Sequence, residues 1–164
     1  MEQLQVFDEN KEMLNESVDR DKKLQLPDGK YFMVILVFIE NQHHQYLIQK
    51  TSVEKDSIYA TTGGHVTYGD TGIFTAQKEL KEELGIDVSL EELKYIDTLK
   101  YPKAYCEIYY LSKEIDLEKI QLQEEEVEKV EWMTEEEIER LIQSGNFRKV
   151  NIVPFQKVKK THKE

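Results

Sequence analysis

The chain has 164 residues, of which 39% are hydrophobic and 34% charged, with a formal net charge of −11. This length and composition predict one globular domain over residues 1–164. The acidic balance argues against nucleic-acid binding, which needs basic surface. The longest apolar run, residues 31–39, is too short to cross a bilayer, so no membrane contact is expected. A single cysteine, Cys106, and an N-terminus without a signal-peptide pattern fit a cytoplasmic protein.

The first 30 residues are polar, and we expect an N-terminal extension there with one short strand at residues 4–7. Runs rich in β-branched and aromatic residues predict the remaining strands at residues 31–39, 46–49, 58–62, 93–99, 104–111 and 127–133. The run at 31–39 is apolar throughout, which indicates burial on both faces, and residues 46–49 are expected to pair with it as a hairpin. The strand at 58–62 leads into an expected glycine loop at residues 63–65.

Helical periodicity appears after this loop. Residues 72–84 are predicted as a helix, with Thr71 as N-cap and Gly85 as the residue that ends it. The apolar side chains that recur at helical spacing are Ile73, Ala76, Leu80 and Leu84. A second helix is predicted at residues 135–143, and residues 150–164 are expected to form a C-terminal helix, over 150–160, or tail. The order of strands and helices predicts an α/β fold with a mixed sheet between helices.

Three carboxylates, Glu79, Glu82 and Glu83, fall on an arc beside the apolar stripe of the first helix. Like charges at this spacing cost a few tenths of a kcal/mol per pair. A divalent cation such as Mg²⁺ or Mn²⁺ removes that cost, because hard cations take oxygen ligands. The alternative is a solvated acidic face, since the chain has other glutamate runs at 124–126 and 135–137. The glycine loop and Asp70 immediately before the helix favour a metal site that handles phosphate.

Residues 64–86, GHVTYGDTGIFTAQKELKEELGI, resemble the Nudix box, G-x5-E-x7-R-E-U-x-E-E-x-G-U, in which U is aliphatic. Seven of its nine specified positions match; the departures are Asp70 for Glu and Lys78 for Arg. The resemblance implies the α/β/α sandwich of Nudix domains. It also implies hydrolysis of a nucleoside diphosphate linked to another group, with water attacking phosphorus.

The same resemblance implies roles for individual residues. Glu79, Glu82 and Glu83 match the metal-binding glutamates, and Glu82 or Glu83 is also a candidate base. Asp70 and Lys78 match a pair that ties the loop to the helix, with a looser grip because Lys lacks the planar fork of Arg.

Candidates outside the glutamate cluster complete the expected site. Gly63, Gly64 and His65 are candidates for contact with substrate phosphate, since glycine lets backbone approach closely. Glu126 and Glu131 are candidates for one further carboxylate. The expected partner is a small-molecule diphosphate, and the resemblance also admits a homodimer.

Two alternatives to hydrolysis stay open. The first is a noncatalytic Nudix domain that binds a nucleotide, which the departures at Asp70 and Lys78 allow. The second is an isopentenyl-diphosphate isomerase, which the motif Thr62-Gly63-Gly64-His65 faintly resembles. That reaction implies a Cys and Glu pair that moves protons at carbon, and Cys106 lies on another predicted strand.

Overall fold

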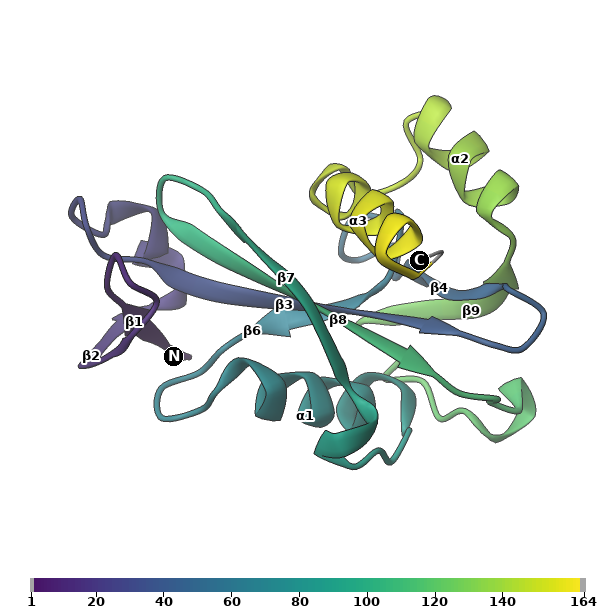
Figure 1. The fold of residues 1–164 in the computed structure, drawn as a ribbon, viewed down its shortest axis with the longest axis horizontal. Helices are drawn as coiled ribbons and strands as arrows, with labels where there is room; N and C mark the ends of the chain where they lie inside the picture. Colours follow the sequence, from purple (N-terminus) through teal and green to yellow (C-terminus); the bar gives the residue numbers. More distant parts are fainter. Residues whose placement is uncertain (1, 163–164) are drawn as a thin grey trace.

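The computed structural model describes residues 2–162, and its centre is a mixed seven-stranded sheet with helices on both faces (Figure 1). The two middle strands, β3 (Phe32–Glu40) and β8 (Ala104–Ser112), pair in parallel along their whole length. All other pairs in this sheet are antiparallel. They involve β4 (Tyr46–Thr51), β5 (Tyr59–Ala60), β6 (Thr62–His65), β7 (Lys94–Lys100) and β9 (Val127–Met133).

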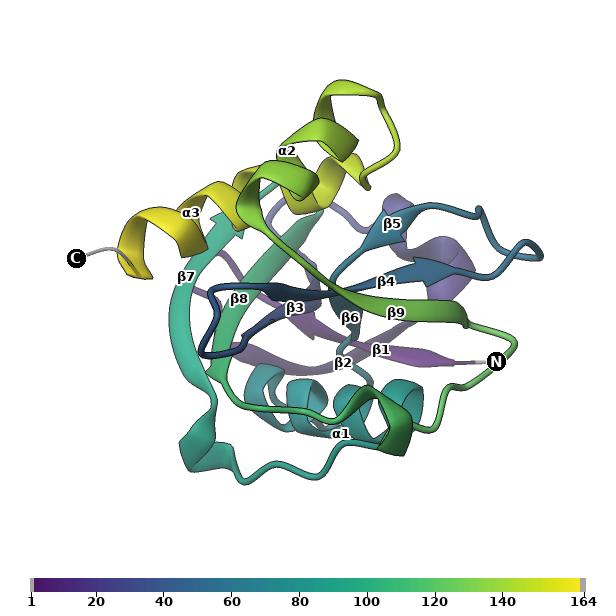
Figure 2. The same cartoon turned by 90° about the vertical axis from the view of Figure 1, so that its right-hand side faces the viewer.

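The helices divide the molecule into two cores. Helix α1 (Gly72–Leu84) covers one face of the sheet, while α2 (Glu135–Gln143) and α3 (Ile152–His162) lie on the other (Figures 1 and 2). Side chains of β3 alternate between the two cores: Ile35 packs with the α1 core, and Phe38 packs with the α3 core. The expected α/β/α sandwich with a mixed sheet is therefore confirmed. Short 3₁₀ turns complete the chain: η2 (Leu90–Glu92), η3 (Leu117–Lys119) and η4 (Lys149–Asn151).

The predicted hairpin of β3 and β4 is only partly present. These strands pair at Glu40 and Tyr46 and then separate, because β6 occupies the edge of β3 from Val34 to Val37. The expected glycine loop is wrong, since Gly63 and Gly64 lie inside β6. The reason for glycine at position 64 is space: a Cβ there would lie 2.5 Å from Cδ of Glu79. Glycine in β6 thus lets α1 sit close to the sheet.

The N-terminal segment contains more regular structure than its polarity suggested. Strands β1 (Gln3–Phe7) and β2 (Met13–Asp19) form a two-stranded sheet, followed by the 3₁₀ turn η1 (Arg20–Gln25). Strand β1 is fixed by hydrogen bonds from Gln5 N to Val66 O, 3.0 Å, and from Phe7 N to Tyr31 O, 2.8 Å. This attachment brings η1 to the end of β6, and so to the candidate site.

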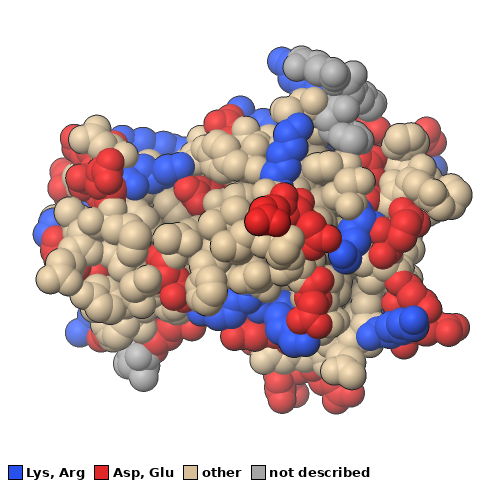
Figure 3. Space-filling view, turned by 60° about the horizontal axis from the view of Figure 1, so that its bottom comes forward, with Lys and Arg blue, Asp and Glu red and all other residues tan. Residues whose placement is uncertain are grey.

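The C-terminal helix begins at Ile152, close to the predicted start, and Lys163 and Glu164 lie outside the described residues. Within residues 2–162, no helix has the length and apolarity that a membrane crossing needs. On the face that carries α1, acidic and basic side chains of the described residues are interspersed, and these residues form no broad basic patch there (Figure 3).

Candidate functional site

Helix α1 is held at both ends by the predicted caps. Thr71 Oγ1 accepts a hydrogen bond from Phe74 N, 3.3 Å, and Gly85 adopts φ 69° while its N–H donates to Lys81 O, 3.0 Å. The apolar stripe faces the sheet and belongs to the α1 core, comprising Ile73, Ala76, Leu80 and Leu84. The glutamates on the adjacent arc are consequently fixed along one side of a cavity.

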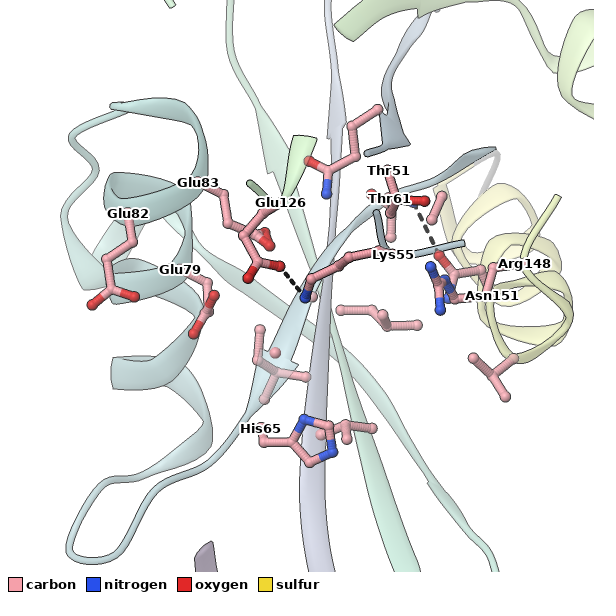
Figure 4. Close-up of a pocket in the computed structure, with 18 of the residues that line it drawn as sticks. Thr51, Lys55, Thr61, His65, Glu79, Glu82, Glu83, Glu126, Arg148 and Asn151 are labelled. Atoms are coloured by element: carbon pink, nitrogen blue, oxygen red, sulfur yellow. Dashed lines mark hydrogen bonds and ion pairs between the residues drawn. The ribbon is translucent and has the colours of Figure 1, made fainter. Parts of the chain in front are cut away.

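The three glutamates differ in their exposure to solvent. Glu83 is buried, Glu79 is half-buried and Glu82 is exposed. In Figure 4 the Glu83 side chain points into the cavity next to the Glu126 carboxylate, and Glu82 lies on the outer side of the helix. All three line the same cavity, so the structure brings the predicted cluster together at its wall and rim.

Two of these carboxyl groups are hard to ionise in the absence of a cation. Burial raises the pKa of Glu83 to about 8, and the charge of Glu79 adds to the rise, while a hydrogen bond from Gln49 opposes it. Burial likewise raises the pKa of Glu79 to about 7, with a further contribution from the Glu82 charge. Within residues 2–162, Oε2 of Glu83 is a buried oxygen with no hydrogen-bond partner.

These oxygens fit a hard divalent cation. A buried, unpartnered carboxylate oxygen next to a second carboxylate gains most from a cation, and Mg²⁺ and Mn²⁺ favour such ligands. In the described part of the chain, however, no three His, Cys, Asp or Glu side chains converge as a ready-made metal cage. A cation at this wall would take part of its coordination from water or substrate oxygens, as Mg²⁺ usually does.

The cavity beside α1 measures about 600 Å³, enough for a nucleotide-sized ligand. Its acidic wall comes from α1, its floor from β3 and β6, and its far wall from β5 and η4 (Figure 4). Polar side chains on the floor and far wall are Gln49, Thr51, Thr61, Arg148 and Asn151. Apolar side chains among the lining residues are Val34, Ile35, Leu36, Ala60 and Val150.

Three cationic side chains line this cavity, and each is paired with an acid. Lys55, from the turn between β4 and β5, reaches across to Glu126 and forms an ion pair with it (Figure 4). At the far wall, an Arg148 guanidinium nitrogen lies 2.8 Å from Oδ2 of Asp56. The third cation, Arg20 of η1, lies 3.0 Å from Glu2.

The two carboxylates expected from outside the helix have different positions. Glu126 lines the cavity beside Glu83: Gln123 N donates to Glu83 O, 3.1 Å, and Glu126 N donates to Gln123 O, 2.8 Å. Glu131 lies on β9, does not line the cavity and pairs with Lys129 at 3.4 Å. Only Glu126 is therefore placed where it can take part in the site.

His65 ends β6 at the cavity wall and is held as a neutral ring. Burial lowers its pKa to about 3, and the charges of Arg20, Lys23 and Lys55 add to the effect. Its Nε2 lies 2.7 Å from Lys23 Nζ, so the ammonium donates and the ring accepts. The ring also stacks on Phe32, with centroids 5.8 Å apart. With Nε2 occupied as an acceptor, the neutral ring carries its proton on Nδ1, so His65 is an uncharged donor toward a ligand.

Asp70 and Lys78 form an ion pair between the segment after β6 and helix α1, with Lys78 Nζ 2.9 Å from Asp70 Oδ2. Thr67 Oγ1 donates to the same carboxylate oxygen, 2.9 Å. Burial lowers the pKa of Lys78, but the hydrogen bond and charge of Asp70 outweigh it, so the net pKa is raised. Lys78 Nζ also donates to Thr67 Oγ1, 3.3 Å, so the ammonium ties both residues of the segment before α1 to the helix.

The cations of the cavity and Asn151 are not marked by any local sequence pattern. Lys55 and Arg148 lie in short polar connections, and Arg20 lies in a segment expected to be an extension. Asn151 contacts Thr61, 90 residues earlier in the chain. Each becomes part of the cavity only through tertiary contacts.

Comparisons with known proteins show the family to which the chain belongs. The family profile described as NUDIX domain matches residues 30–155. An uncharacterized Nudix hydrolase from Listeria innocua is 30% identical over 151 residues, which cover 90% of this chain and 88% of the relative.

Solved structures share the fold. A crystal structure of a Deinococcus radiodurans protein, DR0079, superposes with a TM-score of 0.70 at 20% identity, covering 88% of this chain and 91% of the other. An Ap4A hydrolase from C. elegans superposes with a TM-score of 0.51 at 22% identity, covering 67% of this chain and 86% of the other. At these identities the two likenesses establish the fold alone.

Proposed function

This chain belongs to the Nudix hydrolase family, and we propose that it hydrolyses a diphosphate bond in a metal-dependent reaction. The proposed substrate is a nucleoside-diphosphate-linked or related small molecule. Water attacks one phosphorus, the bond from that phosphorus to the bridging oxygen breaks, and two phosphorylated products leave.

One observation carries this proposal: the buried Glu83 carboxyl faces a cavity with an unpartnered oxygen and a pKa raised to about 8. Such a group costs stability unless a ligand compensates for it. Glu79, with its pKa raised to about 7, lies on the same wall. Two adjacent carboxyl groups with raised pKa values are expected in a protein that binds a cation between them when it is active.

Glu79, Glu82 and Glu83 would hold Mg²⁺ or Mn²⁺, with Glu126 as a further oxygen ligand. A divalent ion supplies positive charge to the phosphate oxygens and lowers the pKa of water. The chain itself positions the carboxylates through the caps of α1, and Glu82 or Glu83 accepts the proton of the attacking water. His65, as a neutral ring, is placed at the cavity wall for a hydrogen bond to phosphate.

The cations provide the remaining recognition of an anionic substrate. Lys55, Arg148 and Arg20 each pair with one carboxylate when no substrate is bound, and each can turn to a phosphate oxygen in a charge-assisted hydrogen bond when substrate binds. This arrangement explains how a chain with a net charge of −11 attracts a diphosphate locally.

The isomerase alternative receives no support from the position of the thiol. Cys106 is 3% exposed on β8, packs in the α3 core and does not line the cavity. Burial also raises the pKa of the Cys106 thiol to about 12, so the thiol stays protonated and cannot act as a base near neutral pH. A noncatalytic binding role differs from the proposal only in turnover, so an activity assay separates the two.

The proposal is tested by a hydrolysis panel. Purified protein is incubated with nucleoside triphosphates, nucleotide sugars, dinucleoside polyphosphates such as Ap4A, and prenyl diphosphates, each with Mg²⁺ or with EDTA. Release of phosphate or nucleotide from at least one compound, dependent on Mg²⁺, is expected. Binding of a nucleotide without turnover of any compound would establish the noncatalytic alternative instead.

A further inference from the structure

The far wall of the cavity contains a second buried polar group, Asn151, at the end of η4. Its side chain is 1% exposed and lines the cavity (Figure 4). Oδ1 accepts a hydrogen bond from the backbone N–H of Thr61, 3.0 Å. Because a backbone N–H can only donate, this contact fixes which amide atom is the oxygen. The orientation of the Asn151 amide is therefore determined.

The other end of that amide is unpartnered. Nδ2 has no hydrogen-bond partner within residues 2–162, although it is closed to bulk solvent. The neighbouring polar groups are satisfied: Thr61 Oγ1 donates to Val37 O, and Arg148 pairs with Asp56. Buried donors in folded proteins are nearly always paired, and each exception calls for an explanation. Here the cavity supplies one, since a ligand at the far wall can bring the missing acceptor.

We propose that Asn151 binds the nucleobase of the substrate at this wall. Its Nδ2 donates a hydrogen bond to a carbonyl oxygen or a ring nitrogen of the base. This inference rests on the proposed function, because it takes the phosphates to lie at the opposite, acidic wall. It narrows the substrate class to nucleotides whose base reaches the wall formed by β5 and η4.

The apolar neighbours favour a base over other groups. The lining residues of the floor and far wall include the apolar side chains Val34, Leu36, Ala60 and Val150. A nucleobase presents flat faces to apolar side chains and acceptors at its edge. A sugar is polar around its whole circumference and would place hydroxyl groups against these apolar side chains. A prenyl chain offers no acceptor, so it would leave Nδ2 unpaired in the complex as well.

The segment that carries Asn151 also exposes side chains at the cavity. Val150 is 58% exposed, the Arg148 side chain is 35% exposed, and both line the cavity. Both belong to the short segment that leads into α3, and Arg148 is held there by Asp56. In this proposal a base reaches Nδ2 by displacing exposed side chains of this segment.

The test compares binding of probes that stay intact. They are the α,β-methylene analogues of ADP, GDP, CDP and UDP, with methylenediphosphonate as the probe without nucleoside. Calorimetry with Mg²⁺ present gives the affinity of each. In the parent protein we expect at least one nucleotide analogue to bind tenfold or more tightly than methylenediphosphonate.

Two variants then isolate the donor. Asn151→Asp keeps the acceptor for Thr61 N–H and removes the amide donor, whereas Asn151→Leu removes both. Each should reduce the preference for the nucleotide analogue by roughly tenfold, while methylenediphosphonate binding changes less than about twofold. Thermal melting checks that both variants fold.

The outcomes separate the two hypotheses. An undiminished nucleotide preference in both variants overturns the role of Asn151, as does an equal loss of affinity for both kinds of probe. Tighter binding of isopentenyl diphosphate than of every nucleotide analogue in the parent also overturns it. If methylenediphosphonate fails to bind in a Mg²⁺-dependent way, the acidic wall has been misassigned and the proposed function fails instead.

Discussion

Replacing Glu83 with glutamine should stabilise the protein in the absence of metal, and the gain should grow with pH. Glutamine has nearly the shape of the protonated side chain, so it keeps the packing of a residue that is 8% exposed. It lacks the charge that the buried site disfavours. The substitution therefore removes an electrostatic cost that a bound cation would otherwise offset.

The magnitude follows from the pKa, which rises from 4.5 to about 8. One pKa unit corresponds to about 1.4 kcal/mol, so the full rise represents about 5 kcal/mol. We expect a measured gain of about 1–3 kcal/mol, because the ionised wall relaxes and Glu79 shares the proton. The sign is fixed: the folded state binds more protons than the unfolded state between pH 4.5 and 8, so the stability of the parent falls as pH rises through that window.

Urea denaturation in EDTA at pH 5.5, 7 and 8.5 measures this effect as the difference in unfolding free energy between variant and parent. The difference should be small at pH 5.5 and largest at pH 8.5. Glu82→Gln is the matched control, since Glu82 is exposed on the same helix turn. The burial of a destabilising charge at Glu83 would be contradicted by a Glu83→Gln variant that is less stable than the parent at pH 8.5. The same difference in unfolding free energy at every pH would also contradict it.

Three further changes test other parts of the site. Asp70→Glu and Lys78→Arg together should maintain or raise the hydrolysis rate, and a double-mutant cycle should show that their effects are not additive. Strictly additive effects on the rate would mean that the two residues of this ion pair act independently. Lys55→Met should raise KM about tenfold, because it removes a charge-assisted contact to phosphate. The control Lys50→Met removes an ion pair with Glu128 outside the cavity and should leave KM unchanged. The same KM in the Lys55→Met and Lys50→Met variants would exclude Lys55 from substrate binding. Cys106→Ala should leave hydrolysis unchanged and show no isomerisation of isopentenyl diphosphate, measured by product chromatography; isomerisation that depends on this thiol would contradict the assignment.

The parts of the structure that depend on local signals could be predicted from the sequence. Helix α1 has the predicted bounds because its stripe, its Thr71 cap and its Gly85 terminator all lie within residues 71–85. Strand β9 and helix α2 also have their predicted bounds, because the residues that indicate each element lie within it or next to it. The glutamate cluster follows directly once the helix is known.

Other features are set by contacts between distant segments. The pattern around Gly63 and Gly64 suggested a loop, but the free edge of β3 draws these residues into β6. Strand β2 was missed because its residues are mostly exposed and polar, and β1 supplies its pairing. Asn151 acquires its orientation from Thr61, and no pattern near residue 151 could indicate that partner.

Titration with Mn²⁺, followed by electron paramagnetic resonance, measures cation binding at the acidic wall without requiring a known substrate. The parent protein should bind Mn²⁺ in competition with Mg²⁺, and the double variant Glu82→Gln/Glu83→Gln should bind it at least about tenfold more weakly while remaining folded. Equal Mn²⁺ affinity in the parent and this variant would place the metal elsewhere and contradict the account.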